Sequence, residues 1–123
     1  MEKTTFQPLP HVPLSKVVKA NGFLFLAGEA SIDWSTRATV PGDITVQTQK
    51  TLENLRTTLE SVGSSLERVV KTTVFLTNID DFAAMNAAYA AFFPSDPPAR
   101  STIAVAALAR PDLIVEIELV ALP

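Results

Sequence analysis

The sequence contains no cysteine and a single histidine, His11. The lack of cysteine excludes thiol nucleophiles, disulfide bonds and thiolate metal sites. One histidine cannot build a multi-histidine metal cluster, and it argues against a Ser-His-Asp triad. Because His11 lies between Pro10 and Pro13 in a proline-rich arm, we expect its side chain to face solvent. Any catalysis by this chain would therefore depend on other groups.

Strong positive charge and long apolar runs are also missing. The 123 residues carry a net charge of −3 and contain no basic run, so nucleic acid is a poor partner. No apolar run approaches the ~20 residues of a membrane span, and the N-terminal residues lack the apolar core of a signal peptide. We therefore expect a cytoplasmic protein with neither a membrane nor a nucleic-acid partner.

Three common catalytic motifs are absent as well. The sequence has no Walker A loop, no G-x-G-x-x-G fingerprint and no H-E-x-x-H pair. Chemistry by this chain would therefore fall to arginine, glutamate, backbone amides and water.

Apolar residues are abundant, at 47% of 123 residues. This length suits one domain, spanning residues 1–123. A domain of this size buries only about two thirds of the surface that its unfolded chain exposes. The apolar excess therefore predicts that some faces are buried against other subunits.

The dipeptide Asn21-Gly22 is the clearest turn signal, because it favours the two-residue turn of a β-hairpin. It predicts antiparallel strands at 17–20 and 23–27. Residues 6–14 hold three prolines and are predicted to be an extended arm. Residues 31–42, after the hairpin, are predicted to be a polar loop.

Two helices are predicted in the rest of the chain. The first is capped by Asp43, ends near Val62 and buries a stripe of leucines. The second is capped by Asn78 or Asp80 and ends before Pro94. Apolar segments rich in β-branched residues predict three more strands, at 69–77, 99–106 and 113–121.

The resulting order is β-β-α-β-α-β-β. It predicts a two-layer α+β domain in which two helices pack on one face of a mixed β-sheet. The chain has no third layer to cover the opposite face of the sheet. We therefore expect oligomerisation to cover it.

The segment Pro98-Ala99-Arg100-Ser101-Thr102 opens a strand that is otherwise almost wholly apolar. A guanidinium there needs an anionic partner, because burying it unpaired is costly. Its planar fork suits a carboxylate. Arg100 could therefore form a structural ion pair with Glu116, Glu118 or a helix carboxylate, or it could bind the carboxylate of a small acid.

Glu116 and Glu118 alternate with apolar residues, so they share one strand face, about 7 Å apart. Glu118 suits a solvated face or a subunit contact, whereas Glu116, farther from the chain end, is the better general acid/base. Asn86 is either a surface amide or a hydrogen-bonding group aimed at a pocket. Gly28 either ends a strand or exposes its backbone to a ligand, since glycine permits close approach.

Nearly the whole chain resembles the RidA family of enamine and imine deaminases, also called the YjgF or Rid family. Its Pro-Ala-Arg-Ser segment is the most specific feature. The matching segments include Phe25-Leu26-Ala27-Gly28-Glu29, Val69-Val70-Lys71-Thr72-Thr73-Val74-Phe75-Leu76, Asp81-Phe82-Ala83-Ala84-Met85-Asn86, Pro98-Ala99-Arg100-Ser101 and Val115-Glu116-Ile117-Glu118.

The resemblance implies a chorismate-mutase-like fold and a homotrimer with three pockets between subunits. It implies hydrolysis of 2-imino or enamine acids, such as 2-aminoacrylate, to 2-keto acids and ammonia, with no metal or organic cofactor. The arginine matching Arg100 holds the substrate carboxylate in that family, and the glutamate matching Glu116 positions water or relays a proton. Backbone groups at Gly28 and Thr102 line the pocket, and the asparagine matching Asn86 lies nearby.

Four positions depart from the family pattern. Leu14 replaces a usual tyrosine, Ala27 a serine, Glu29 a glutamine and Thr102 a common cysteine. We expect Leu14 and Ala27 to line a more apolar substrate pocket, with Glu29 adding a carboxylate nearby. This pocket would favour apolar imino acids over the smallest one.

Two other functions remain open. The chain could be a non-catalytic trimer whose clefts bind a keto acid, or a ribonuclease or translation inhibitor, a label attached to part of the family. The acidic charge balance and the lone histidine argue against the ribonuclease.

Overall fold

The computed structural model describes residues 2–123. Its strands are β1 (Lys3–Pro8), β2 (Ser15–Ala20), β3 (Phe23–Glu29), β4 (Ile32–Asp33), β5 (Ala38–Thr39), β6 (Val69–Leu76), β7 (Ala99–Ala104) and β8 (Val115–Ala121). Its helices are α1 (Ile44–Ser61) and α2 (Phe82–Ala90), with 3₁₀ turns η1 (Leu66–Arg68) and η2 (Ile79–Asp81).

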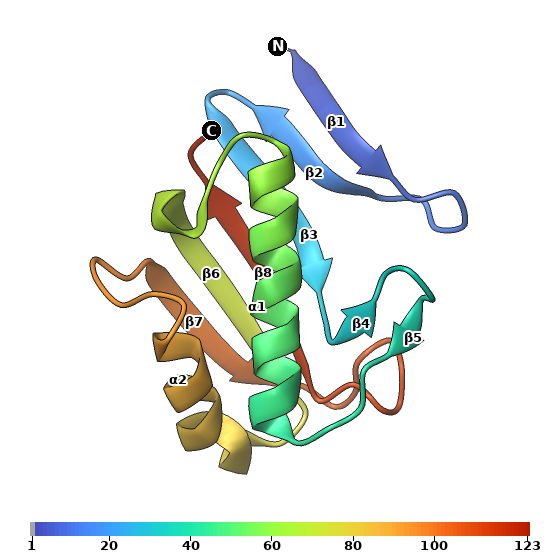
Figure 1. Ribbon diagram of the computed structural model, residues 1–123, viewed down its shortest axis with the longest axis vertical. Helices are drawn as coiled ribbons and strands as arrows, with labels where there is room; N and C mark the ends of the chain where they lie inside the picture. The colour runs from blue at the N-terminus through green and yellow to red at the C-terminus, as the bar shows by residue number, and fades with distance from the viewer. Residues whose placement is uncertain (1) are drawn as a thin grey trace.

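Both helices lie on one face of a six-stranded sheet (Figure 1), whose order is β1-β2-β3-β8-β6-β7. The β6–β7 pair is parallel and the other pairs are antiparallel. This mixed sheet with two helices on one face confirms the predicted two-layer α+β fold. No helix within residues 2–123 is long and apolar enough to cross a membrane.

Local sequence signals account for the central hairpin and for α1. Asn21 and Gly22 have φ values of 52° and 79°, as a type I′ turn requires at both central positions. The Asp43 side chain accepts a hydrogen bond from the Val46 amide at 3.0 Å and caps α1. Gly63 follows the helix at φ 81°, a left-handed conformation that glycine adopts without strain.

Three predicted segments differ from the structure in more than their end residues. The arm predicted at residues 6–14 begins inside the sheet, because residues 3–8 form edge strand β1, where a terminal proline is tolerated since it need not donate to the ladder. The polar loop 31–42 contains the small β4–β5 hairpin. Asn78 caps η2 by accepting from the Asp80 amide, so α2 begins only at Phe82.

The two faces of the sheet differ sharply. On β8, the alternate residues Val115, Ile117, Leu119 and Ala121 are buried beneath the helices. On the other face, Phe23, Phe25 and Ile103 are 38%, 46% and 46% exposed. The described chain therefore leaves this face uncovered.

Candidate functional site

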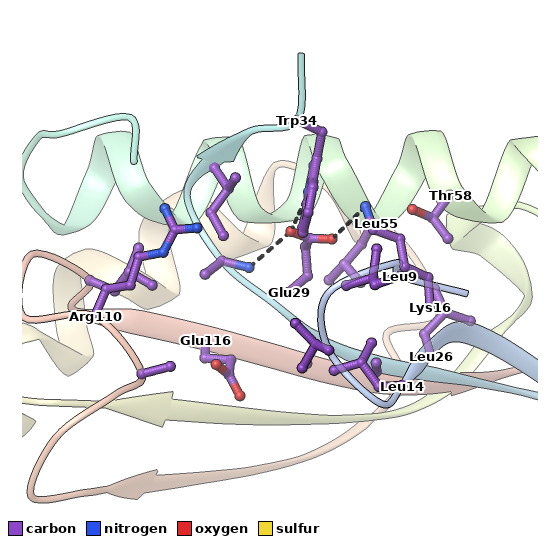
Figure 2. Close-up of a pocket in the computed structure, with 17 residues that line it drawn as sticks. Leu9, Leu14, Lys16, Leu26, Glu29, Trp34, Leu55, Thr58, Arg110 and Glu116 are labelled. Carbon is purple, nitrogen blue, oxygen red and sulfur yellow. Dashed lines mark hydrogen bonds and ion pairs between the residues drawn. The ribbon is translucent and has the colours of Figure 1, made fainter. Parts of the chain in front are cut away.

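A cavity of about 370 Å³ opens where β2 and β3 separate. The two strands pair as far as Val17 and Leu26, and no further pairs follow. Beyond that point the arm before β2 and the end of β3 diverge. Four of the predicted site residues line this cavity, and Figure 2 shows its walls. They are Leu14, Ala27, Gly28 and Glu116.

A β-bulge presents Gly28 to the cavity. Leu26 pairs with Leu119 and Glu29 with Ile117, so two residues of β3 oppose one residue of β8. A Cβ atom placed on Gly28 would lie only 2.9 Å from Cδ of Glu116. The Glu116 carboxyl group therefore packs directly on the Gly28 backbone, and only glycine leaves it this room.

Glu116 is half-buried, and its surroundings favour the protonated form. Burial raises its pKa, and the neighbouring carboxylates of Glu118 and Glu29 raise it further. A raised pKa makes this carboxyl group hold a proton more readily and return it afterwards, as a general acid/base must.

A buried polar cluster in the same cavity was missed by the sequence reasoning. Lys16 Nζ lies 3.6 Å from Glu29 Oε2 and 3.5 Å from the centre of the Trp34 ring. Trp34 Nε1 donates to Glu29 Oε1 at 2.9 Å. The carboxylate that we expected to add charge to the site is thus held in an ion pair. The register of the β2–β3 hairpin could have predicted this contact. Extended by one pair beyond Val17 and Leu26, it sets Lys16 opposite Ala27, two residues before Glu29.

Arg100 lies elsewhere, on the helix-facing side of β7. It is the register partner of Thr72, whose side chain is fully buried beneath α2. Its Cζ atom lies 4.8 Å from the centre of the Tyr89 ring and 5.6 Å from that of Phe82. The Tyr89 hydroxyl is 2.7 Å from Thr72 Oγ1, which fixes this ring beneath the guanidinium.

The structural ion pair considered for Arg100 is not formed. Within residues 2–123, no carboxylate oxygen lies within 4.0 Å of its guanidinium. Aromatic faces attract the cation without occupying its hydrogen-bonding edge. The two aromatic rings therefore fix the position of the Arg100 guanidinium, and its N–H groups are left to bind a carboxylate.

Thr102 and Asn86 accompany Arg100. Thr102 follows it by two positions on β7 and so points to the same face. Asn86 lies on the face of α2 that carries Phe82 and Tyr89, at spacings of four and three residues. Its Oδ1 atom is buried and has no hydrogen-bond partner among the described residues.

The predicted residues thus fall into two groups that do not meet within one chain, and Glu116 and Arg100 face opposite sides of the sheet. We call Leu14, Ala27, Gly28 and Glu116 the cavity half-site, and Arg100, Thr102 and Asn86 the edge half-site. On β6, Glu116 pairs with Phe75 and Arg100 pairs with Thr72. Phe75 and Thr72 are three positions apart, so their side chains, and those of their partners, point to opposite faces of the sheet. One chain therefore holds its carboxylate-binding group and its acid/base group apart.

The described part of the chain contains no cluster of three His, Asp or Glu side chains able to hold a metal ion.

Comparison with known proteins gives concordant matches. The family model described as endoribonuclease L-PSP matches residues 4–122. A RutC family protein of Pyrococcus horikoshii is 45% identical over 114 residues, covering 93% of this chain and 90% of that protein. The mitochondrial protein mmf2 of Schizosaccharomyces pombe is 47% identical over 92 residues, covering 75% and 71%. The crystal structure of YyfA, a Rid-family protein of Yersinia pestis, superposes with a TM-score of 0.93 at 35% identity, covering 99% and 100%.

Proposed function

The chain belongs to the Rid family, whose model carries the endoribonuclease L-PSP description, and we propose that it is a hydrolase that converts 2-imino acids to 2-keto acids and ammonia. One observation carries the proposal: a carboxyl group with a raised pKa is packed on a bulged glycine inside a cavity, while the same chain holds an arginine with no acidic partner among residues 2–123.

Arg100 would bind the substrate carboxylate through two parallel hydrogen bonds. This grip fixes the position of the imine carbon, and orientation supplies part of the rate. The guanidinium also stabilises negative charge that develops on the substrate during attack.

Glu116 would accept a proton from a water molecule as the water oxygen bonds to the imine carbon. The nitrogen takes that proton back from Glu116, which gives a neutral carbinolamine. Glu116 then accepts the carbinolamine hydroxyl proton and passes it to the same nitrogen as the C–N bond breaks, so that ammonia leaves, the carbonyl forms, and imine plus water yields keto acid plus ammonia. Glu116 returns to its ionised form and is ready for the next water.

The two half-sites meet only if a second copy supplies one of them. We propose a homotrimer in which the edge half-site of one subunit closes the cavity half-site of its neighbour. The exposed Phe25 and Ile103 on the uncovered sheet face support such packing, because large apolar side chains favour burial at an interface. Light scattering that gives a soluble monomer would remove this part of the proposal.

Two alternatives use the same family membership. A non-catalytic trimer would bind keto acids in these clefts without turning over imines. Ribonuclease activity has the support of the family model's description, but His11 is exposed and the chain has net charge −3. The proposal keeps the cytoplasm as the compartment, although the name of the relative mmf2 places that protein in mitochondria.

The decisive assay generates imines in situ with an amino-acid oxidase and follows their disappearance. Hydrolysis faster than the spontaneous rate supports the deaminase. Keto-acid binding with no acceleration of imine hydrolysis would favour the non-catalytic binding trimer. Degradation of an RNA control would favour the ribonuclease.

A further inference from the structure

Lys16 and Trp34 have no part in the proposed hydrolysis, and Glu29 acts there only through its charge on Glu116, yet these three residues form one wall of the cavity (Figure 2). Lys16 is 12% exposed and Glu29 only 5%. A buried ion pair contributes little net stability, because removing both charges from water costs nearly as much as their attraction returns. A contribution to fold stability is therefore a weak explanation for the presence of the Lys16–Glu29 ion pair.

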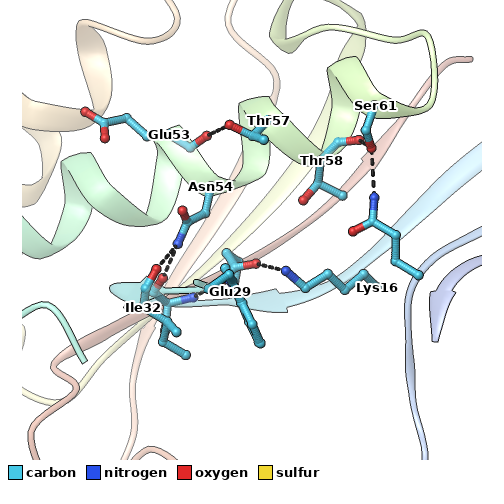
Figure 3. A network of polar contacts seen from close by, with 11 residues as sticks. Lys16, Glu29, Ile32, Glu53, Asn54, Thr57, Thr58 and Ser61 are labelled. Carbon is cyan, nitrogen blue, oxygen red and sulfur yellow. Dashed lines mark hydrogen bonds and ion pairs between the residues drawn. The ribbon is translucent and has the colours of Figure 1, made fainter. Parts of the chain in front are cut away.

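Several contacts hold the Glu29 carboxylate in place. Its Oε1 atom accepts from Trp34 Nε1 at 2.9 Å and from the Ala30 amide at 3.2 Å. Asn54 of α1 donates to the carbonyl oxygens of Ala30 and Ile32, at 3.1 and 2.8 Å, and so anchors the chain that follows Glu29 (Figure 3). Glu29 Oε2 remains directed at Lys16 from a fixed position.

Lys16, which pairs with the fixed Glu29 carboxylate, lines the cavity. Apolar side chains, including Leu14, Leu26 and Leu55, line the same space. Burial lowers the pKa of Lys16, and the Glu29 carboxylate partly offsets this effect. Desolvation is the effect that lets a lysine amine lose its proton and act as a nucleophile, and the adjacent carboxylate can accept that proton.

We propose that Lys16 is a carbonyl-capturing residue that forms a Schiff base with a 2-keto acid bound in this cavity. The inference rests on the proposed function for its ligand, because a 2-keto acid is the product of the proposed hydrolysis, but the capture step itself uses Lys16 and its neighbours.

The atoms balance without an added reagent. The Lys16 ammonium gives one proton to Glu29, and the free amine attacks the carbonyl carbon to form a C–N bond. The carbonyl oxygen takes up protons and leaves as water. An ammonium and a ketone thus become a protonated Schiff base and one water, with the charge unchanged.

The surroundings suit the product as well as the free lysine. The protonated Schiff base carries the same single positive charge as the ammonium, so the Glu29 carboxylate continues to neutralise it. The Trp34 ring attracts either cation over its face. Apolar walls limit the access of water, which would otherwise hydrolyse the adduct.

The test uses the unmodified protein with 2-ketobutyrate and sodium cyanoborohydride, which delivers hydride to a Schiff base and leaves a stable secondary amine. Peptide mass spectrometry then locates the adduct among the five lysines, Lys3, Lys16, Lys19, Lys50 and Lys71. Lys19 is the internal control, because it lies on the same strand and is exposed.

We expect about tenfold more adduct on Lys16 than on Lys19, since the cavity holds the carbonyl beside the amine. Trp34, the only tryptophan of the chain, should report saturable binding by its fluorescence. Lys16→Arg should abolish the selective adduct, whereas Lys19→Arg should leave it in place. Butyrate, which lacks the carbonyl, should give no adduct.

Labelling spread over the exposed lysines, or no adduct on Lys16, would overturn the proposal. Neither result bears on imine hydrolysis, which is measured separately.

Discussion

The cavity half-site and the edge half-site surround their charged groups in opposite ways. Glu116 lies near two other carboxylates, Glu118 and Glu29, and these together with burial raise its pKa. Arg100 meets no carboxylate within residues 2–123 and rests on two aromatic rings. One region thus holds an acid/base group that readily takes up a proton, and the other holds a cation that still lacks an anion.

This contrast shows what each half-site lacks. Arg110 lines the cavity, but its guanidinium donates to the Arg37 carbonyl oxygen at 2.8 Å and to Thr39 Oγ1 at 3.3 Å. The edge half-site has no carboxyl group to activate water. A substrate that carries both a carboxylate and an imine would satisfy both half-sites at once, provided that two subunits bring them together.

The largest expected effect comes from removing the cation. Arg100→Ala should lower kcat/KM for imine hydrolysis by about 10³-fold, because two charge-assisted hydrogen bonds are lost. Arg100→Lys should also fail, since a point charge cannot reproduce the two-point grip. Coupled-oxidase kinetics measure both variants.

Arg56→Ala is the matched control for Arg100, because its guanidinium also lies over an aromatic ring, that of Phe92, outside both half-sites. It should keep wild-type activity. Retention of most activity by Arg100→Ala would remove Arg100 from the mechanism.

Removing the acid/base group should have the next largest effect. Glu116→Gln should lower kcat by about 10²-fold while keeping keto-acid affinity, because the amide keeps the shape but cannot accept a proton. Isothermal titration and steady-state kinetics separate the two quantities. Glu118→Gln should be milder, and the reverse order would mean that the wrong glutamate was assigned.

The pH profile tests the same group. Hydrolysis needs ionised Glu116, so activity should fall as the pH drops through its raised pKa, above the usual glutamate value of about 4.3. Glu118→Gln removes one cause of the raised pKa and should move this acid limb to lower pH. The exposed Glu53→Gln serves as control and should not move it.

A smaller loss should follow from crowding Glu116 without changing its chemistry. Gly28→Ala places a methyl group against the Glu116 carboxyl group. Because that carboxyl group ends a flexible side chain, it should shift while the fold persists, and kcat should fall about tenfold. Adding Glu116→Asp, which shortens the side chain, should recover part of the loss. A Gly28→Ala variant with full activity would show that the carboxyl position is unimportant.

The smallest effect concerns substrate choice. Leu14→Tyr with Ala27→Ser should shift the ratio of kcat/KM toward imines from serine or threonine, relative to leucine or methionine, by about tenfold or less. The two positions line one cavity and can couple, so the double variant is the informative one. An unchanged ratio would mean that neither side chain faces the substrate.

Local signals were sufficient to predict much of the fold. The Asn21-Gly22 turn, the Asp43 cap and the shared face of Glu116 and Glu118 each depend on neighbouring residues, and the structure shows all three. The edge strand β1 was missed because prolines obscured its pairing with β2.

The site was harder to predict because it depends on contacts between distant segments. The helix-facing direction of Arg100 follows from its parallel register with Thr72, which the sequence alone does not specify. Lys16 and Glu29 lie beyond the last register pair of β2 and β3, Val17 with Leu26, so the hairpin pattern brings them near each other without specifying an ion pair. The residue types of the site were therefore predictable, but the placement of Arg100 and Glu116 on opposite faces of the sheet was not.

Subunit complementation tests the shared site most directly. Arg100→Ala and Glu116→Gln chains, each with about 1% of wild-type activity or less when alone, are unfolded, mixed in equal amounts and refolded. If each site combines Glu116 of one subunit with Arg100 of its neighbour, random mixing makes about a quarter of the sites intact, and about a quarter of wild-type activity should return. A mixture no more active than its separate parts would show that one chain supplies both groups and would contradict this account.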